Sequence, residues 1–162
     1  MSTIEQSDDL RPRTGFAASR WILRLLLSLT AVTAVAQPIT IGQYLDGRYA
    51  LLQMHSTGAA ALEFFGLLLI PMAIWYVVAG GRVWVLITML LAVAIEAQAI
   101  LGYVRDLGLH IPLGVAVVGG ALALAIWFWT PSSARHRPRR PRGRRRRAAT
   151  EAQPEPTEAV VG

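Results

Sequence analysis

The sequence of 162 residues contains no cysteine, and it also lacks lysine and asparagine. Without thiols, a disulfide scaffold, a thiolate metal site and a cysteine nucleophile are all excluded. Charged residues make up only 16% of the chain, whereas 54% are hydrophobic and the mean hydropathy is +0.43. A soluble domain of this size cannot hide so many apolar side chains from water, so we expect them to face lipid.

Short motifs of common enzyme sites are also missing. The chain has no P-loop, no dinucleotide-binding glycine signature, no HExxH and no serine in a nucleophile elbow. We therefore expect no enzyme activity. The sequence favours a binding or interaction protein, such as an accessory membrane subunit.

Four apolar stretches have about the ~20 residues that a helix needs to cross ~30 Å of hydrocarbon. In lipid every backbone amide must be bonded within its own segment, so stretches this long and apolar must be helices. The predicted fold is all-α, an up-down-up-down bundle of four transmembrane helices within residues 20–130. The helices are expected at about 20–41, 56–79, 83–102 and 111–129.

The segment between the first two helices is too apolar for an open loop. We expect it either to continue both helices to a turn at Asp46 and Gly47 or to cap the outer end of the bundle. Pro38 is expected to end or kink the first helix. A signal peptide cleaved after Ala36 is an alternative for that helix, since small residues precede Gln37.

The two ends of the chain differ from the apolar region. Residues 1–19 form a polar extension, and residues 131–162 form a tail rich in arginine and proline that we expect to be disordered. Arginines in this tail anchor the last helix and are attracted to anionic phospholipid headgroups by about 1 kcal/mol each. Nucleic acid is an unlikely partner because no aromatic residues interleave the arginines. The predicted headgroup contacts are Arg135, Arg137, Arg139, Arg140, Arg142, Arg144, Arg145, Arg146 and Arg147.

Arginine placement also predicts the orientation in a plasma membrane. Cytoplasmic segments keep arginine, and here the leading segment, the turn near Arg82 and the tail are rich in it, whereas the other two loops hold only Arg48 and Arg105. Both termini are therefore expected in the cytoplasm. Aromatic residues agree, since the tryptophans (Trp21, Trp75, Trp84, Trp127 and Trp129) fall at the inner boundary and the tyrosines (Tyr44, Tyr49 and Tyr103) toward the outer one.

Two histidines indicate a possible cofactor site. His55 and His110 reach the same outer boundary on the second and fourth helices, which are diagonal neighbours in such a bundle. Diagonal axes lie roughly 12 to 14 Å apart, given about 8 to 10 Å between adjacent ones, so two inward imidazoles can hold a haem iron between them. Small residues near both histidines (Gly58, Ala59, Gly66 and Gly114) leave room for a macrocycle. Polar anchoring at the membrane surface is the alternative role.

Two glutamates support a different hypothesis. Glu63 and Glu96 lie about 10 to 12 Å in from the outer face by helical rise, on adjacent helices. At equal depth they can meet and share a proton, as in a proton-coupled or cation-coupled carrier. The alternative is that each is hydrogen-bonded to a neighbour such as Gln37 or Gln98 and holds helices together. In either case the polar site would open outward.

The order of four helices, with a Gly-Gln-Tyr-Leu-Asp-Gly segment at 42–47 leading to Leu-Gln-Met-His at 52–55, resembles small uncharacterised integral membrane proteins of actinobacteria. It is also loosely similar to the histidine-bearing helical halves of cytochrome-b-like and haem-A-synthase-like proteins. That second resemblance implies haem b as a cofactor with His55 and His110 as axial ligands. Lipid, a membrane-protein partner or a second copy of the chain are the expected partners.

The arginine distribution yields a prediction about topology. A tag placed after Gly162 should be protected from external protease in intact cells and cleaved only after the membrane is permeabilised, because arginine-rich segments remain cytoplasmic. A tag in the turn at Gly47 serves as the control and should be accessible. Cleavage of the C-terminal tag in intact cells would refute this orientation.

Overall fold

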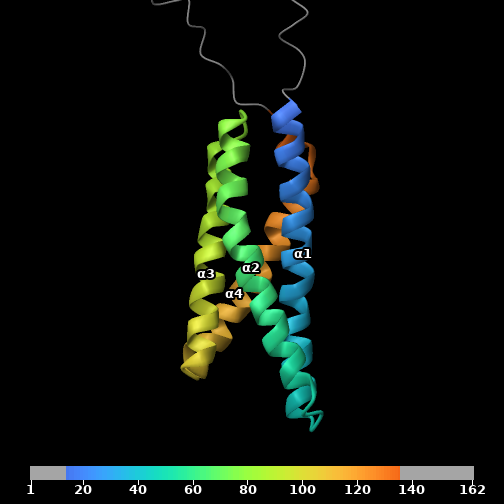
Figure 1. The fold of residues 1–162 in the computed structure, drawn as a ribbon, viewed down its shortest axis with the longest axis vertical. Helices are drawn as coiled ribbons and strands as arrows, with labels where there is room; N and C mark the ends of the chain where they lie inside the picture. Colours follow the sequence, from blue (N-terminus) through green and yellow to red (C-terminus); the bar gives the residue numbers. More distant parts are fainter. Residues whose placement is uncertain (1–13, 136–162) are drawn as a thin grey trace, which may run out of the picture.

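The computed structural model describes residues 14–135, and its helices form one elongated bundle (Figure 1). The all-α, four-helix prediction is confirmed for this part of the chain. The helices are α1 (Thr14–Leu45), α2 (Leu51–Val78), α3 (Ile87–Tyr103) and α4 (Leu107–Trp129), with two short 3-10 turns, η1 (Val83–Leu86) and η2 (Pro131–Ala134).

The helices have the length and surface of membrane spans. α1, α2 and α4 are each long and apolar enough to cross a bilayer, and α3 is a shorter apolar helix that directly follows η1. Large apolar side chains remain exposed all around the bundle, for example Val32 and Val115, each 70% exposed. Helices that are apolar on every side are typical of proteins surrounded by lipid. The fold is therefore that of a membrane protein.

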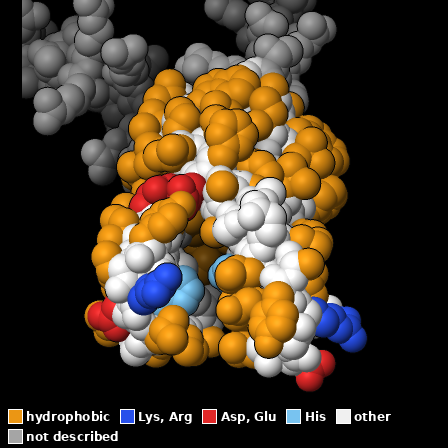
Figure 2. Space-filling model, turned by 60° about the horizontal axis from the view of Figure 1, so that its bottom comes forward, with side chains coloured by type: hydrophobic (Ala, Val, Ile, Leu, Met, Phe, Trp, Pro, Cys, Tyr) orange, Lys and Arg blue, Asp and Glu red, His pale blue; other side chains and the backbone are white. Residues whose placement is uncertain are grey.

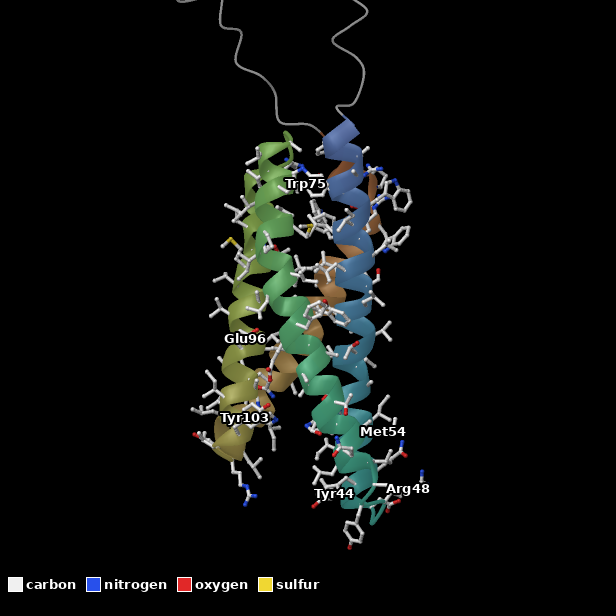
Figure 3. The ribbon with its side chains drawn as sticks, viewed as in Figure 1. Tyr44, Arg48, Met54, Trp75, Glu96 and Tyr103 are labelled. Atoms are coloured by element: carbon white, nitrogen blue, oxygen red, sulfur yellow. The ribbon has the colours of Figure 1, made fainter. Side chains whose placement is uncertain are left out.

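The four helices pack as a ring. α1 contacts α2 and α4, and α3 contacts the same two helices, so α2 and α4 lie diagonally across the bundle as predicted. The chain enters α1 and leaves α4 at one end, called here the terminal end (Figure 1). The opposite end, called the loop end, carries the α1–α2 and α3–α4 turns. Labelled aromatic residues lie as expected, Trp75 at the terminal end and Tyr44 and Tyr103 at the loop end (Figure 3).

Helix boundaries differ from the predicted ones at both ends of the chain. α1 begins at Thr14, inside the predicted polar extension, because Phe16 is buried against the ring of Tyr76. The last helix is followed by the ordered turn η2, inside the predicted disordered tail, where Ser133 is fully buried. Tertiary contacts of single residues therefore extend the ordered region beyond the apolar stretches.

Pro38 does not end the first helix, as one of the two predictions for it required. α1 continues through Pro38 to Leu45, since a proline removes only one intrahelical hydrogen bond and neighbouring turns stay bonded. The helix ends where Gly47 adopts a φ of 93°, which glycine tolerates best. α2 starts at Leu51, so both helices do continue to a turn at Asp46 and Gly47.

An aromatic cluster fastens the terminal end. The ring of Tyr76 packs on Phe16 and Phe128, with centroids 5.3 and 5.6 Å apart. Its hydroxyl donates a 2.8 Å hydrogen bond to the carbonyl of Ser133, and all four residues are buried. Three helices and η2 therefore meet at one tyrosine.

Arg24 strengthens the same end. This buried side chain donates from Nε to the carbonyl of Phe128 at 2.6 Å, which joins α1 to α4. Its guanidinium group also lies 4.8 Å from the ring of Trp21 and 5.1 Å from that of Trp129. Cation–π contacts of this kind contribute about 0.5 to 2 kcal/mol each. The guanidinium charge is thus stabilised by one carbonyl and two indole faces.

The Tyr76 contacts lead to a stability prediction. Tyr76→Phe removes the donor to the Ser133 carbonyl and leaves that buried acceptor unpaired, which should lower the free energy of unfolding by about 1 to 3 kcal/mol. Thermal unfolding in mild detergent, followed by circular dichroism, measures this. Tyr103→Phe, at a side chain that is 77% exposed, is the matched control. Equal midpoints for the two variants would contradict the assigned role of the hydroxyl.

Candidate functional site

The predicted histidines come together at the loop end. Both line one cavity of about 60 Å³, to which all four helices contribute. In Figure 2 histidine side chains are visible on both sides of the hollow between the two hairpins. At roughly 10–15 Å³ of probe space per molecule, the cavity holds a few waters. The lining residues are Gln37, His55, Ala59, Leu62, Ile95, Gln98, Ala99, His110 and Val117.

Each histidine is held by a backbone carbonyl of the preceding helix. His55 Nδ1 lies 3.3 Å from the carbonyl oxygen of Gln37, and His110 Nδ1 lies 3.0 Å from that of Gln98. A carbonyl only accepts, so in both neutral rings Nδ1 carries the proton and donates it. Nε2 is then left with its lone pair, which is the atom that a metal can bind.

In each hairpin, one glutamine side chain of the first helix packs against a glycine of the second helix. A Cβ on Gly58 would overlap Nε2 of Gln37, and a Cβ on Gly114 would lie 2.8 Å from Nε2 of Gln98. The Oε1 atoms of both glutamines are buried and have no hydrogen-bond partner. These amides occupy the places that side chains on the two glycines would take, and Gln37 Nε2 also donates to the Thr33 carbonyl at 3.4 Å. Their oxygens are left unsatisfied, which costs free energy.

Glu63 and Glu96 lie together but apart from the histidines. Glu96 projects from α3 midway along the bundle (Figure 3), and its Oε1 would lie 3.4 Å from a Cβ on Gly66 of α2. The two carboxyl groups are near enough to interact electrostatically, and neither residue lines the cavity. In Figure 2 acidic side chains appear on the flank of the bundle, surrounded by apolar ones. Oε1 of each is buried without a partner, so neither glutamate is hydrogen-bonded through that atom.

Of the nine predicted headgroup contacts, only Arg135 belongs to the described part of the chain. It is exposed and directly follows η2. The others lie outside the described residues: Arg137, Arg139, Arg140, Arg142, Arg144, Arg145, Arg146 and Arg147.

The role of the glutamine backbones was not predicted from the sequence. Gln37 and Gln98 were predicted only as possible hydrogen-bond partners of Glu63 and Glu96, whereas the structure shows their backbone carbonyls orienting the two imidazoles. A signal for this pairing was present: both glutamines occur in the pattern Ala-Val-x3-Ala-Gln-x-Ile, at 31–39 and 92–100. Comparing the two halves of the chain would have found it.

The fold defines a multi-pass membrane protein with a largely apolar cavity, lined also by two histidines and two glutamines, toward one end of a four-helix bundle. No protein-family model, curated protein or solved structure matches the chain.

The hydrogen bonds of the imidazoles lead to a spectroscopic prediction. ¹⁵N NMR of the protein labelled at histidine should show that the neutral forms of His55 and His110 carry the proton on Nδ1, because each Nδ1 faces a carbonyl. His136→Gln removes the third histidine from the spectrum. A protonated Nε2 with a bare Nδ1 on either ring would contradict this assignment.

Proposed function

We propose that this protein is a membrane-embedded binding subunit that holds haem b between His55 and His110. One observation carries the proposal: two imidazoles from diagonal helices line one cavity, and each donates from Nδ1 to a backbone carbonyl, which leaves Nε2 as the nitrogen with a lone pair. Ligating histidines commonly have their other ring nitrogen fixed in this way.

The number of donors favours haem over a bare metal ion. Within residues 14–135 no group of three or more histidine, aspartate or glutamate residues could hold a metal ion. A structural zinc ion takes four protein ligands and a catalytic one three, so two imidazoles are too few. Haem iron needs only the two axial positions, because the macrocycle supplies the other four nitrogens.

The neighbours of the two histidines also suit a flat macrocycle. Gly58 and Gly114 lie one turn after His55 and His110 and leave the faces of α2 and α4 without side chains. The Gln37 and Gln98 amides fill these places and the cavity of about 60 Å³ holds only a few waters, so haem binding requires both amides to rotate away and the two hairpins to move apart. The rotation breaks the 3.4 Å bond from Gln37 Nε2 to the Thr33 carbonyl and frees two buried oxygens that have no partner.

Bound haem would supply a one-electron redox couple. The chain would contribute the two axial nitrogens and an apolar lining from residues such as Leu62, Ile95 and Val117, which limits water at the iron. As an accessory subunit of the plasma membrane, the protein would then carry electrons near the outer face. The carrier hypothesis has less support, because Glu63 and Glu96 lie outside the cavity.

A spectroscopic titration tests the proposal. Haemin added to the purified full-length protein in mild detergent should give the low-spin spectrum of six-coordinate, bis-imidazole haem. His55→Ala and His110→Ala should each lose that spectrum, because each removes one axial nitrogen.

Two controls separate binding from partitioning into micelles. His136→Ala should bind as the wild type does, and the His55→Ala, His110→Ala double variant shows the spectrum of haem dissolved in detergent alone. A wild-type spectrum equal to that of the double variant would refute haem binding.

A further inference from the structure

The two hairpins of the bundle share sequence patterns at corresponding places. Besides the Ala-Val-x3-Ala-Gln-x-Ile pattern of α1 and α3, an Ala-Ile-Trp-aromatic pattern occurs in α2 at 73–76 and in α4 at 125–128. Self-similarity of this kind is the mark of internal repeats. The α1–α2 hairpin and the α3–α4 hairpin are therefore candidates for two copies of one unit.

The contacts of the two hairpins repeat as well. In each, a glutamine of the first helix accepts from a histidine of the second and rests its amide on a glycine of that second helix. The helix preceding each turn also ends alike, with a residue of positive φ: Gly47 at 93° and Arg105 at 60°. In both turns, the amide after that residue bonds to the carbonyl five positions earlier.

The two hairpins differ in the number of residues between corresponding positions. From the glutamine to the residue of positive φ, α1 is three residues longer than α3, and from that residue to the histidine the first hairpin is again three residues longer. Three residues are close to one helical turn. The first hairpin is thus lengthened by about a turn on each side of the loop-end turn, and it is three residues longer again between the histidine and the Ala-Ile-Trp-aromatic pattern. In Figure 1 it extends further at the loop end.

The repeat places an approximate two-fold axis along the bundle. Tyr76 and Phe128 close the two copies of the Ala-Ile-Trp-aromatic pattern, and their rings contact each other at the terminal end. His55 and His110, the equivalent pair at the loop end, line the same cavity. Parallel repeats in membrane proteins are related by an axis along the membrane normal, with ligand sites at the repeat interface.

We infer that the cavity is a two-fold site built from two copies of one hairpin, in which the Gln37 and Gln98 amides hold the places that the macrocycle takes. The inference rests on the proposed haem function and adds the residues that make way for the ligand. The two half-sites correspond in kind, since each supplies one imidazole, one glycine face and one displaceable amide, although Gly58 follows His55 by three residues and Gly114 follows His110 by four.

Substitutions at the glycines test this, with haem affinity measured in the full-length protein. Gly58→Val and Gly114→Val should each weaken haem binding about tenfold or more, because their side chains enter the place of the macrocycle. Both variants should fold, since the atom they displace is the end of a flexible glutamine. Gly119→Val is the matched control in α4, where nothing lies within 4 Å of an added Cβ.

Substitutions of the two glutamines provide a second test. Gln37→Ala and Gln98→Ala should each bind haem more tightly than the wild type, because each removes an amide that the macrocycle must displace while the backbone carbonyl that orients the histidine remains. The double variant Gln37→Ala, Gly58→Val should still bind haem weakly, since the valine itself blocks the ligand. Wild-type or weaker binding by Gln37→Ala, or wild-type affinity in the double variant, would overturn the displacement.

Unfolding of the haem-free protein separates this inference from the proposed function. If the halves are equivalent, the coupling between Gln37→Ala and Gly58→Val in thermal stability should match that between Gln98→Ala and Gly114→Val in sign and size. Matched couplings support the two-fold site even if wild type binds no haem, in which case only the cofactor is wrong. Coupling in one hairpin alone, or a haem defect from one glycine alone, would refute the equivalence.

Discussion

The absence of water in hydrocarbon is the constraint on which this structure depends. Because lipid cannot hydrogen-bond a backbone amide, the apolar chain must be helical, and polar side chains are tolerated only where protein satisfies them. Most polar groups in the bundle obey this rule: serines and threonines along the helices bond to carbonyls of the preceding turn, as Thr30 does to Leu26. The exceptions are therefore informative.

Four of the five unpartnered buried side-chain atoms of the described residues lie in the half of the bundle that includes the loop end, and the fifth, Arg20 Nε, lies at the terminal end. The four are oxygens of the two cavity glutamines and the two flank glutamates, whereas at the terminal end Tyr76 and Arg24 each find a carbonyl. The terminal end is thus held mainly by hydrogen-bonded polar groups and aromatic rings. The other retains unsatisfied ones around a cavity, which is the arrangement expected when packing at a site is left incomplete for a ligand.

Hydropathy and arginine placement predicted the helix count, their order and the diagonal relation of the histidine-bearing helices, since these follow from bilayer thickness and short turns. The ends of the ordered region could not be predicted from the sequence, because Phe16 and Ser133 are ordered by contacts with residues far away in the chain. The sequence placed Glu63 and Glu96 about 10 to 12 Å deeper than the histidines, but it could not show which of these side chains share a cavity. In the structure only the histidines line it, because packing decides which face of a helix meets the cavity.

The bond between Arg24 and the Phe128 carbonyl joins residues 104 positions apart. During synthesis, α1 enters the membrane long before α4 exists, so its arginine first has neither this acceptor nor the indole of Trp129. Until then the charge must reach for the interface along its own flexible stem. Arg24 can form these contacts only once α4 is complete, so the terminal end is assembled late in biogenesis.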